Sequence, residues 1–202
     1  MFDAGLPREE GAESLTRRVF LFGAVAAIVG AAVWRYEESQ RSAVKAAADN
    51  RPANVSIVEF SNAGARQGLT QVPRIIKTDD EWRVQLGRSV FEIARKGDTE
   101  FAFSGEYWDW EEKGLFRCVC CQTALFSSAA KFNSGTGWPS FYEPIAKENI
   151  ATREDRSFGM TRIEVSCRRC DAHLGHVFDD GPPPTGRRYC INSASLKFFK
   201  FS

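Results

Sequence analysis

Apolar residues recur at helical spacing in the segment TDDEWRVQLGRSVFEIARKG, residues 78–97. Thr78 and Asp79 are favourable N-cap residues, and Gly97 is a favourable residue at a helix end. Gly87 lies inside the segment and predicts a break between two short helices. The positions that repeat at helical spacing are Trp82, Leu86, Val90 and Ile93. The pattern therefore predicts a small helical region with one buried face.

After Gly97 the pattern changes to short apolar runs separated by Gly, Pro, Asn and Ser. Runs of this length, rich in Phe, Tyr, Ile and Val, are typical of strands in antiparallel sheets. The runs are LFRCVC (115–120), ALFSS (124–128), TRIEVSC (161–167), AHLGHVF (172–178), RRYCINS (187–193) and LKFFKF (196–201). We therefore expect a mainly β protein, in which a small helical lead-in is followed by antiparallel sheets forming a barrel-like domain.

The residues before the helices have other patterns. Residues 35–54 are polar without an apolar face, as in a spacer, and residues 55–73 hold one short alternating run followed by turn residues. We therefore expect three parts: a signal or anchor over 1–34, a linker or N-terminal extension over 35–75, and a folded domain over 76–202.

The first part pairs Arg17 and Arg18 with an uncharged stretch, Val19–Trp34, that is short for a membrane span and rich in Ala and Gly. The run TRRVFLF resembles the twin-arginine signal of bacterial export, with Phe22 where Lys is usual. Export by this route predicts a periplasmic protein. The alternative is an uncleaved segment that associates the protein with the membrane.

Composition is ordinary for a globular protein. The chain has 202 residues, of which 43% are hydrophobic and 26% charged, and its formal net charge is +1. Basic residues are scattered among acidic ones, without the long basic stretch of a nucleic-acid footprint. We therefore expect no nucleic-acid partner.

Four of the six cysteines form two CxxC pairs, Cys118 with Cys121 and Cys167 with Cys170. Two such pairs can complete a tetrahedral zinc site, which would be structural because four thiolates leave no open position. The pairs are further apart than the roughly 15 to 20 residues of a compact zinc ribbon, so the metal would join distant hairpins. Disulfides, which export would permit, are one alternative, and a thioredoxin-like redox motif without its βαβ context is another. Cys120 belongs to neither CxxC pair.

Cys190 lies apart from both pairs and follows Arg187 and Arg188, whose charges would favour a thiolate. His173 and His176 are the only histidines of the chain and can exchange protons near neutral pH. A thiolate with imidazoles is what nucleophilic cysteine chemistry requires. The alternatives are a metal site completed by the histidines, structural histidines, and a buried, inert cysteine.

Long motifs occur in order along the folded part: CVCC, KFNSGTGWPSFYEPI and CRRCDAHLGHVFDDGPPPTGRRYCINSASLKF, with DDEWRVQL and ARKGDTEFAFSGEYW before them. Over about residues 76–202 the chain resembles the B-type peptide-methionine (R)-S-oxide reductases. The resemblance implies thiol-dependent reduction of methionine-R-sulfoxide, bound in oxidised proteins and also free, for the repair of oxidative damage.

The resemblance also implies the roles of residues. Cys190 would attack the sulfoxide sulfur and become a sulfenic acid. His176, and secondarily His173, would donate protons to the leaving oxygen, and Asn192 would orient the histidines.

For the substrate, the resemblance implies that Trp138 packs against the methyl group, although core packing is the alternative for this residue. Phe178 would add to the same wall. Asp180 and Arg188 would support the polar side.

At one position the sequence departs from the residue pattern of that family. Many relatives carry a resolving cysteine directly before GWPSF, where this chain has Thr136. Cys120 could replace it, or an external thiol could attack the sulfenic acid directly, and a thioredoxin-like reductant is the expected partner. The competing class of function is a zinc-ribbon-like binding module that has lost catalysis.

Overall fold

The computed structural model describes residues 29–30, 32–39 and 52–202, and the chain divides into one unit before Ala48 and a second from Ala48 onward. In the first unit the described residues are helical and exposed. No helix in these ranges is both long and apolar enough to cross a membrane. The twin-arginine motif and most of segment 1–34 lie outside the described residues, so export stays a prediction.

The two expected helices are present and separated at Gly87, whose φ of 73° lies in the region that favours glycine. Thr78 caps the first helix through a capping box, since its hydroxyl accepts the Glu81 N–H at 3.3 Å and the Glu81 carboxylate accepts the Thr78 N–H at 2.7 Å. Gly97 ends the second helix in the left-handed conformation. The helices are α2, Asp79–Leu86, and α3, Arg88–Lys96.

The six predicted strands all form, and short strands that the pattern did not show join them. The predicted strands are β3 Gly114–Cys118, β4 Ala124–Ser127, β8 Arg162–Cys167, β9 His173–Phe178, β10 Arg188–Ile191 and β11 Leu196–Lys200. The additional ones in the body are β5 Lys131–Phe132, β6 Ser140–Phe141 and β7 Ile150–Asp155.

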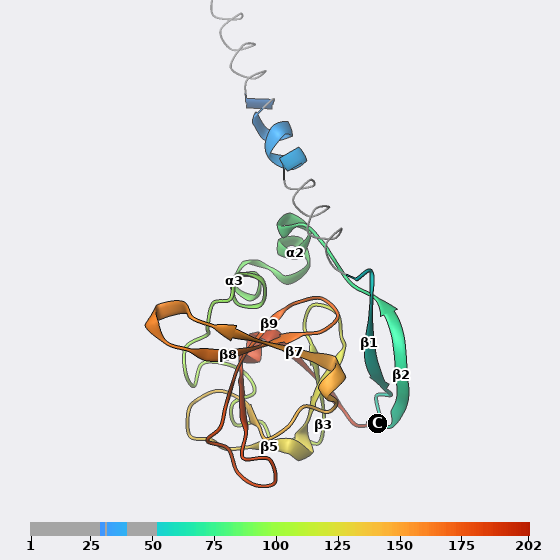
Figure 1. Cartoon of the computed structure of the whole chain (residues 1–202), viewed down its shortest axis with the longest axis vertical. Helices are drawn as coiled ribbons and strands as arrows, with labels where there is room; N and C mark the ends of the chain where they lie inside the picture. Colours follow the sequence, from blue (N-terminus) through green and yellow to red (C-terminus); the bar gives the residue numbers. More distant parts are fainter. Residues whose placement is uncertain (1–28, 31, 40–51) are drawn as a thin grey trace, which may run out of the picture. The chain divides into compact units, whose positions relative to one another are not determined.

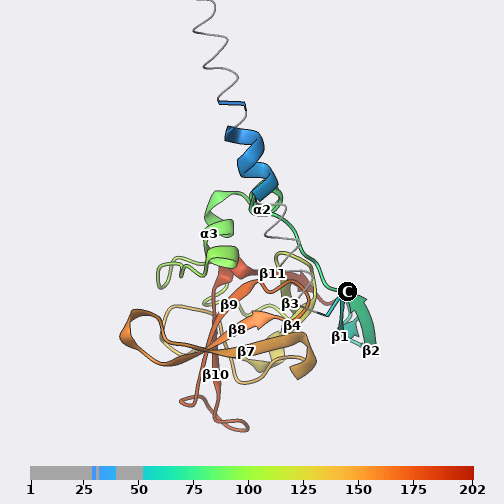
Figure 2. The ribbon, with the colours of Figure 1, turned by 45° about the horizontal axis from the view of Figure 1, so that its top comes forward.

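Antiparallel pairing joins these strands into separate sheets that do not close into the expected barrel. Six strands lie in the order β5-β6-β10-β9-β8-β7, and three in the order β11-β3-β4. Figure 2 shows β7, β8 and β9 side by side. Phe126 and Phe141, from the two sheets, stack with ring centroids 4.4 Å apart in the buried core. Helix α3 packs against β9 and the short turn η4, Ser193–Ser195.

Residues 54–73, assigned from the sequence to the extension, form an antiparallel hairpin of β1, Asn54–Phe60, and β2, Arg66–Pro73 (Figure 1). Asn149 is fully buried and attaches this hairpin to the body. Its amide oxygen accepts the Val58 N–H at 2.7 Å, and its amide nitrogen donates to the carbonyls of Val58 and Ala124, both at 2.8 Å. Residues 54–73 therefore belong to the folded unit.

Candidate active site and metal centre

The first CxxC pair lies in a tight turn between β3 and β4. The N–H of Gln122 donates to the Cys118 carbonyl at 2.8 Å, and the N–H of Cys118 donates to the Thr123 carbonyl at 2.9 Å. Gln122 has a φ of 61°, which reverses the chain directly after Cys121. This backbone turn points both cysteine side chains to the same side.

The second pair has the same backbone pattern between β8 and β9. Asp171 N–H donates to the Cys167 carbonyl and Cys167 N–H donates to the Ala172 carbonyl, both at 2.9 Å. Asp171 has a φ of 56°, at the position equivalent to Gln122. The two halves of the centre are therefore matching knuckles contributed by the two different sheets.

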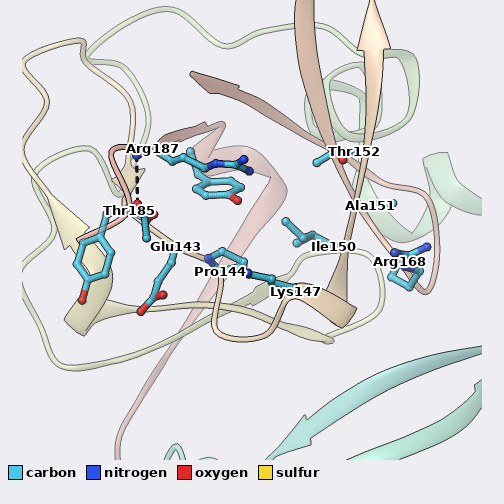
Figure 3. A pocket seen from close by; sticks show the side chains of 11 residues that line it. Glu143, Pro144, Lys147, Ile150, Ala151, Thr152, Arg168, Thr185 and Arg187 are labelled. Atoms are coloured by element: carbon cyan, nitrogen blue, oxygen red, sulfur yellow. Dashed lines mark hydrogen bonds between the residues drawn. The ribbon is translucent and has the colours of Figure 1, made fainter. Parts of the chain in front are cut away.

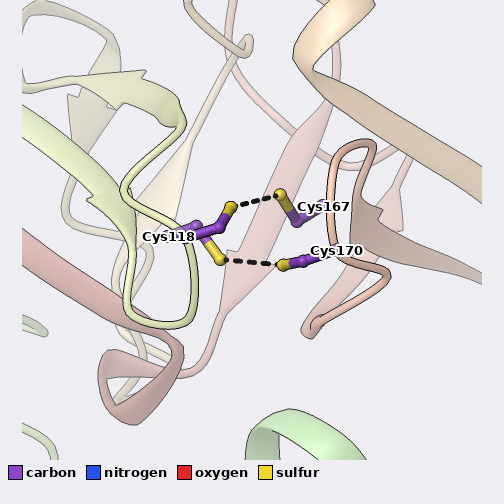
Figure 4. A group of neighbouring side chains, drawn as sticks. Cys118, Cys167 and Cys170 are labelled. Carbon is purple, nitrogen blue, oxygen red and sulfur yellow. Dashed lines mark hydrogen bonds between the residues drawn. The ribbon is translucent and has the colours of Figure 1, made fainter. Parts of the chain in front are cut away.

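The four sulfur atoms form a cluster in which all lie within 4.8 Å of one another, and Figure 4 shows the side chains of Cys118, Cys167 and Cys170 turned toward a common point. Cys118 and Cys170 sulfurs are 3.6 Å apart, and those of Cys121 and Cys167 are 3.5 Å apart. A tetrahedron of sulfurs about 2.3 Å from a zinc ion has edges of about 3.8 Å. A disulfide would need about 2.05 Å, so the donor set fits a metal ion and not disulfides. Cys120 is buried next to the cluster but is not part of it.

Cys190 lies on β10, at the centre of the six-stranded sheet, where it pairs with His176 on β9 and Ser140 on β6. Its side chain opens into a cavity of about 320 Å³. Of the residues proposed from the sequence, this cavity is lined by Cys190, His176, Asn192, Trp138, Phe178 and Arg188. Thr99, Thr136 and Arg162 also line it. The tertiary structure thus brings together residues from five separate segments.

The two histidines reach the same side of β9 because the strand is irregular. Residues three apart on a regular strand point to opposite faces. Here Gly175 pairs with Val165 but His173 pairs with Ser166, so Leu174 is an extra residue that forms a bulge. The imidazole centroids consequently lie only 5.6 Å apart.

Carboxylates on β8 and β7 hold the two imidazoles, and neither carboxylate was identified from the sequence. His173 Nδ1 lies 2.7 Å from Glu164 on β8, and His176 Nε2 lies 2.9 Å from Asp155 on β7. Arg162 also donates to Asp155, at 2.9 Å. No local sequence signal connects these residues, because they meet only through strand pairing.

Burial and hydrogen bonds set the protonation of this network. Burial lowers the pKa of His176 below its ordinary value, against the opposing effect of Asp155. The pKa of Asp155 lies well below its usual range, chiefly because it accepts hydrogen bonds from Ser157 and secondarily because of His176. His173 does not line the cavity; it is buried, and its Nε2 has no hydrogen-bond partner among the described residues. A buried imidazole nitrogen without a partner is available to a ligand or to water.

Asn192 is buried and connects the bulge at Leu174 to the loop that contains Glu100. Its amide donates to the Leu174 carbonyl at 3.2 Å, and its oxygen accepts the Glu100 N–H at 3.1 Å. The Glu100 carbonyl accepts the Trp138 indole N–H at 3.1 Å, and the Glu100 carboxylate accepts two N–H groups of the η4 turn. Glu100 was missed from the sequence, although it positions both Trp138 and Asn192.

Arg188 lies between Cys190 and the aromatic wall. Its guanidinium makes two hydrogen bonds to Asp180, at 2.9 and 2.8 Å, and lies over the Phe178 ring, 4.4 Å from its centroid. Asp180 is itself 62% exposed and does not line the cavity, so it acts there only through Arg188.

Burial raises the pKa of the Cys190 thiol, and the charge of Arg188 and a contact with Thr136 oppose this rise. The Thr136 hydroxyl lies 4.0 Å from the Cys190 sulfur. Arg188 therefore favours the thiolate, as expected from the sequence, but burial outweighs it and leaves the pKa of Cys190 above its ordinary value.

Arg187 does not face this cavity. Strand alternation directs Arg187 and Tyr189 to the other side of β10, where a second cavity of about 460 Å³ lies. Figure 3 shows Arg187, Lys147 and Arg168 among its lining residues. Only one of the two adjacent arginines therefore acts on Cys190.

The fold and site define a β protein with a four-cysteine cluster that fits a metal ion and a separate cysteine–histidine cavity. The SelR domain family matches residues 86–200. Peptide methionine sulfoxide reductase MsrB of Herminiimonas arsenicoxydans is 57% identical over 125 residues, covering 62% of this chain and 91% of that protein. MsrB of Pseudomonas aeruginosa strain UCBPP-PA14 is 58% identical over 124 residues, covering 61% and 94%. Peptide methionine sulfoxide reductase B1, chloroplastic, of Oryza sativa subsp. japonica is 58% identical over 124 residues, covering 61% and 58%.

The chain belongs to the SelR family of peptide methionine sulfoxide reductases.

Proposed function

We propose that this protein reduces the R epimer of methionine sulfoxide, both in oxidised proteins and as the free amino acid, with Cys190 as the nucleophile. The observation that carries the proposal is the single cavity in which Cys190, His176 and Trp138 meet. A binding module with only a structural metal centre would have no use for this combination, which favours the enzyme over the zinc-ribbon-like alternative.

The first step transfers oxygen to the protein. The Cys190 sulfur attacks the sulfoxide sulfur, protons are supplied to the sulfoxide oxygen, and methionine leaves while Cys190 becomes a sulfenic acid. One thiol and one sulfoxide thus give one sulfenic acid and one thioether. His176 is the proton donor that lines the cavity, and with Nε2 engaged by Asp155 it presents Nδ1. His173 lies behind it, with the two ring centroids 5.6 Å apart, and its Nε2 has no hydrogen-bond partner among the described residues.

The cavity walls account for selection of one epimer. Trp138 and Phe178 give an apolar side for the methyl group, and His176 gives a polar side for the oxygen. The other epimer would place its oxygen against the aromatic wall, away from any donor. Arg188, supported by Asp180, completes the polar side.

The second step regenerates the thiol. A thiol of a thioredoxin-like reductant displaces hydroxide from the sulfenic sulfur as water, and a second thiol releases the mixed disulfide. Thr136, whose hydroxyl lies 4.0 Å from the Cys190 sulfur, stands where many relatives carry a cysteine, and a hydroxyl cannot form a disulfide. Cys120 is buried at the metal cluster and does not line the cavity, which supports direct attack by the external thiol.

We infer that the metal is a single structural zinc ion held by Cys118, Cys121, Cys167 and Cys170. Four thiolate ligands leave no position for substrate, so the ion would stabilise the fold and take no part in the oxygen transfer.

We also propose export to the periplasm through the twin-arginine motif at Arg17 and Arg18. Cell fractionation of the wild type and of Arg17→Lys/Arg18→Lys tests this localisation, and equal periplasmic recovery of both would contradict it.

The activity is tested with the R and S epimers of N-acetyl-methionine sulfoxide methylamide, zinc-loaded protein and dithiothreitol. We expect turnover of the R epimer only, and none by Cys190→Ser. Absence of R turnover by the wild type would overturn the proposal in favour of a binding module.

The route of recycling needs a separate measurement. In a single turnover without reductant, the wild type and Cys120→Ser should both accumulate the Cys190 sulfenic acid, detected by dimedone labelling and mass spectrometry. An intramolecular disulfide in the wild type that disappears in Cys120→Ser would show instead that Cys120 resolves the intermediate.

A further inference from the structure

Two phenylalanines stand exposed on the loop that leads into the active-site cavity. Phe101 is 87% exposed and Phe103 is 56% exposed. Thr99, two residues before Phe101, lines the cavity itself. Large aromatic side chains that are this exposed and lie next to a binding site are typical of interaction surfaces.

The backbone presents Phe103 in a conformation that its residue type disfavours. Residues 101–104 form a turn in which the Ser104 N–H and hydroxyl both donate to the Phe101 carbonyl, at 3.2 and 2.7 Å. Phe103 occupies the third position of this turn with a φ of 63°, where glycine is the favourable residue. A turn that needed only to reverse the chain would be more stable with glycine, so the aromatic ring is the feature that this position retains.

The turn is joined directly to the segment that lines the cavity. The Phe103 N–H donates to the Gly137 carbonyl at 2.8 Å, and a Cβ atom at Gly137 would lie only 2.6 Å from the Phe103 nitrogen. Gly137 lies between Thr136 and Trp138, which both line the cavity. The Phe103 ring also makes an edge contact with Trp108, at 5.3 Å between centroids. The turn that carries the two exposed rings is therefore anchored to the segment that lines the cavity, at its rim.

The cavity of about 320 Å³ is large enough for one methionine sulfoxide side chain but not for the polypeptide that carries it. The residues next to the sulfoxide must consequently lie outside, over the rim. We propose that Phe101 and Phe103 form a docking surface for apolar side chains that neighbour the methionine sulfoxide in the substrate chain. This rests on the proposed function and narrows its substrates to sulfoxides in apolar sequence surroundings.

The test compares kcat/KM for three R-sulfoxide substrates: a pentapeptide with Leu on both sides of the sulfoxide, one with Ser in place of Leu, and N-acetyl-methionine sulfoxide methylamide. The double variant Phe101→Ala/Phe103→Gly removes both rings, and glycine keeps the turn because it suits the φ of 63°. We expect the wild type to prefer the Leu peptide and the variant to lose about tenfold on that peptide alone. Val84→Ala, at a residue 89% exposed on α2, is the matched control and should change none of the three values.

Equal use of the Leu and Ser peptides by the wild type, or an unchanged preference in the double variant, would overturn the docking surface while leaving the proposed function intact. A parallel loss on the small substrate would also overturn it, because the rings would then act on the reaction and not on neighbouring residues. Failure of the wild type on the small R substrate would overturn the proposed function, and the docking surface with it.

Discussion

At the scale of single residues, Cys190 is held between opposing influences. Burial raises the pKa of its thiol, and Arg188 and Thr136 lower it, with burial the larger effect. The free protein at neutral pH therefore keeps most of Cys190 as the thiol. A thiol is oxidised less readily than a thiolate, so burial slows adventitious oxidation of Cys190.

Removing Arg188 should raise the pKa of Cys190 further. Because only the thiolate is alkylated, the rate of Cys190 alkylation by iodoacetamide rises as the pH rises through this pKa. In Arg188→Met the rise should move to higher pH, and the rate at neutral pH should fall by a factor of about three. Mass spectrometry of the peptide that contains Cys190 measures the rate. Arg187→Met, which faces the second cavity, should leave the profile unchanged, and equal effects of both substitutions would contradict the assignment.

Asp155 should control the proton supply of His176. Burial lowers the pKa of His176, and Asp155 partly opposes this. Since the imidazole donates only when protonated, the rate of R-sulfoxide reduction should decline as the pH rises through this pKa. In Asp155→Asn the decline should begin at lower pH, and kcat at neutral pH should fall by about tenfold or more. A pH profile that is the same in both proteins would exclude this role.

At the scale of secondary structure, the bulge at Leu174 decides the arrangement of the site. It turns two histidines that are three residues apart to the same side of β9. Gly175 makes the close approach of β9 to β10 possible, since a Cβ atom there would lie 2.1 Å from the Cys190 carbonyl oxygen. The φ of Gly175, 154°, also lies outside the range that other residues readily adopt.

Gly175→Ala should therefore separate β9 from β10 and lower both stability and activity. We expect a loss of about 2 kcal/mol or more in the free energy of unfolding, measured by urea denaturation. Gly68→Ala on β2 is the control, because Gly68 also has a positive φ, 123°, but nothing lies within 4 Å of the added Cβ. A cost no greater than that of the control would show that the contact with Cys190 is relaxed easily.

At the scale of the whole folded unit, the four-cysteine cluster joins the two sheets. One knuckle follows β3 of the three-stranded sheet, and the other connects β8 and β9 of the six-stranded sheet. Loss of the ion would leave four thiols crowded together and would release the end of β9 that carries His173. Structure and activity should thus both depend on a metal ion bound by this cluster, although the cluster lies outside the cavity.

Metal removal should accordingly lower the melting temperature by about 10 °C or more and abolish sulfoxide reduction. Thermal unfolding with and without a strong chelator measures the first effect. Cys167→Ser should reproduce it, whereas Cys120→Ser, which leaves the four ligands intact, should melt like the wild type. An unchanged melting temperature after verified metal loss would contradict a structural role.

The local sequence alone determined the cysteine pairs, six of the strands and the helix boundaries. The CxxC spacing identified both halves of the metal centre, and short apolar runs identified six strands. Thr78, Gly87 and Gly97 marked the helix boundaries correctly. These features are readable because each depends on residues within a few positions of one another, through turn geometry, capping and side-chain alternation.

Only the tertiary structure decided how the segments meet. The bulge at Leu174, the carboxylates of Asp155 and Glu164, and the link from Glu100 to Trp138 all depend on register between distant parts of the chain. No strand of β11-β3-β4 is hydrogen-bonded to a strand of the six-stranded sheet. The pattern of a single strand does not reveal which strands pair. The pKa of Cys190 also depends on the tertiary structure. The sequence shows the neighbouring arginine that lowers this pKa, but not the burial that raises it by more.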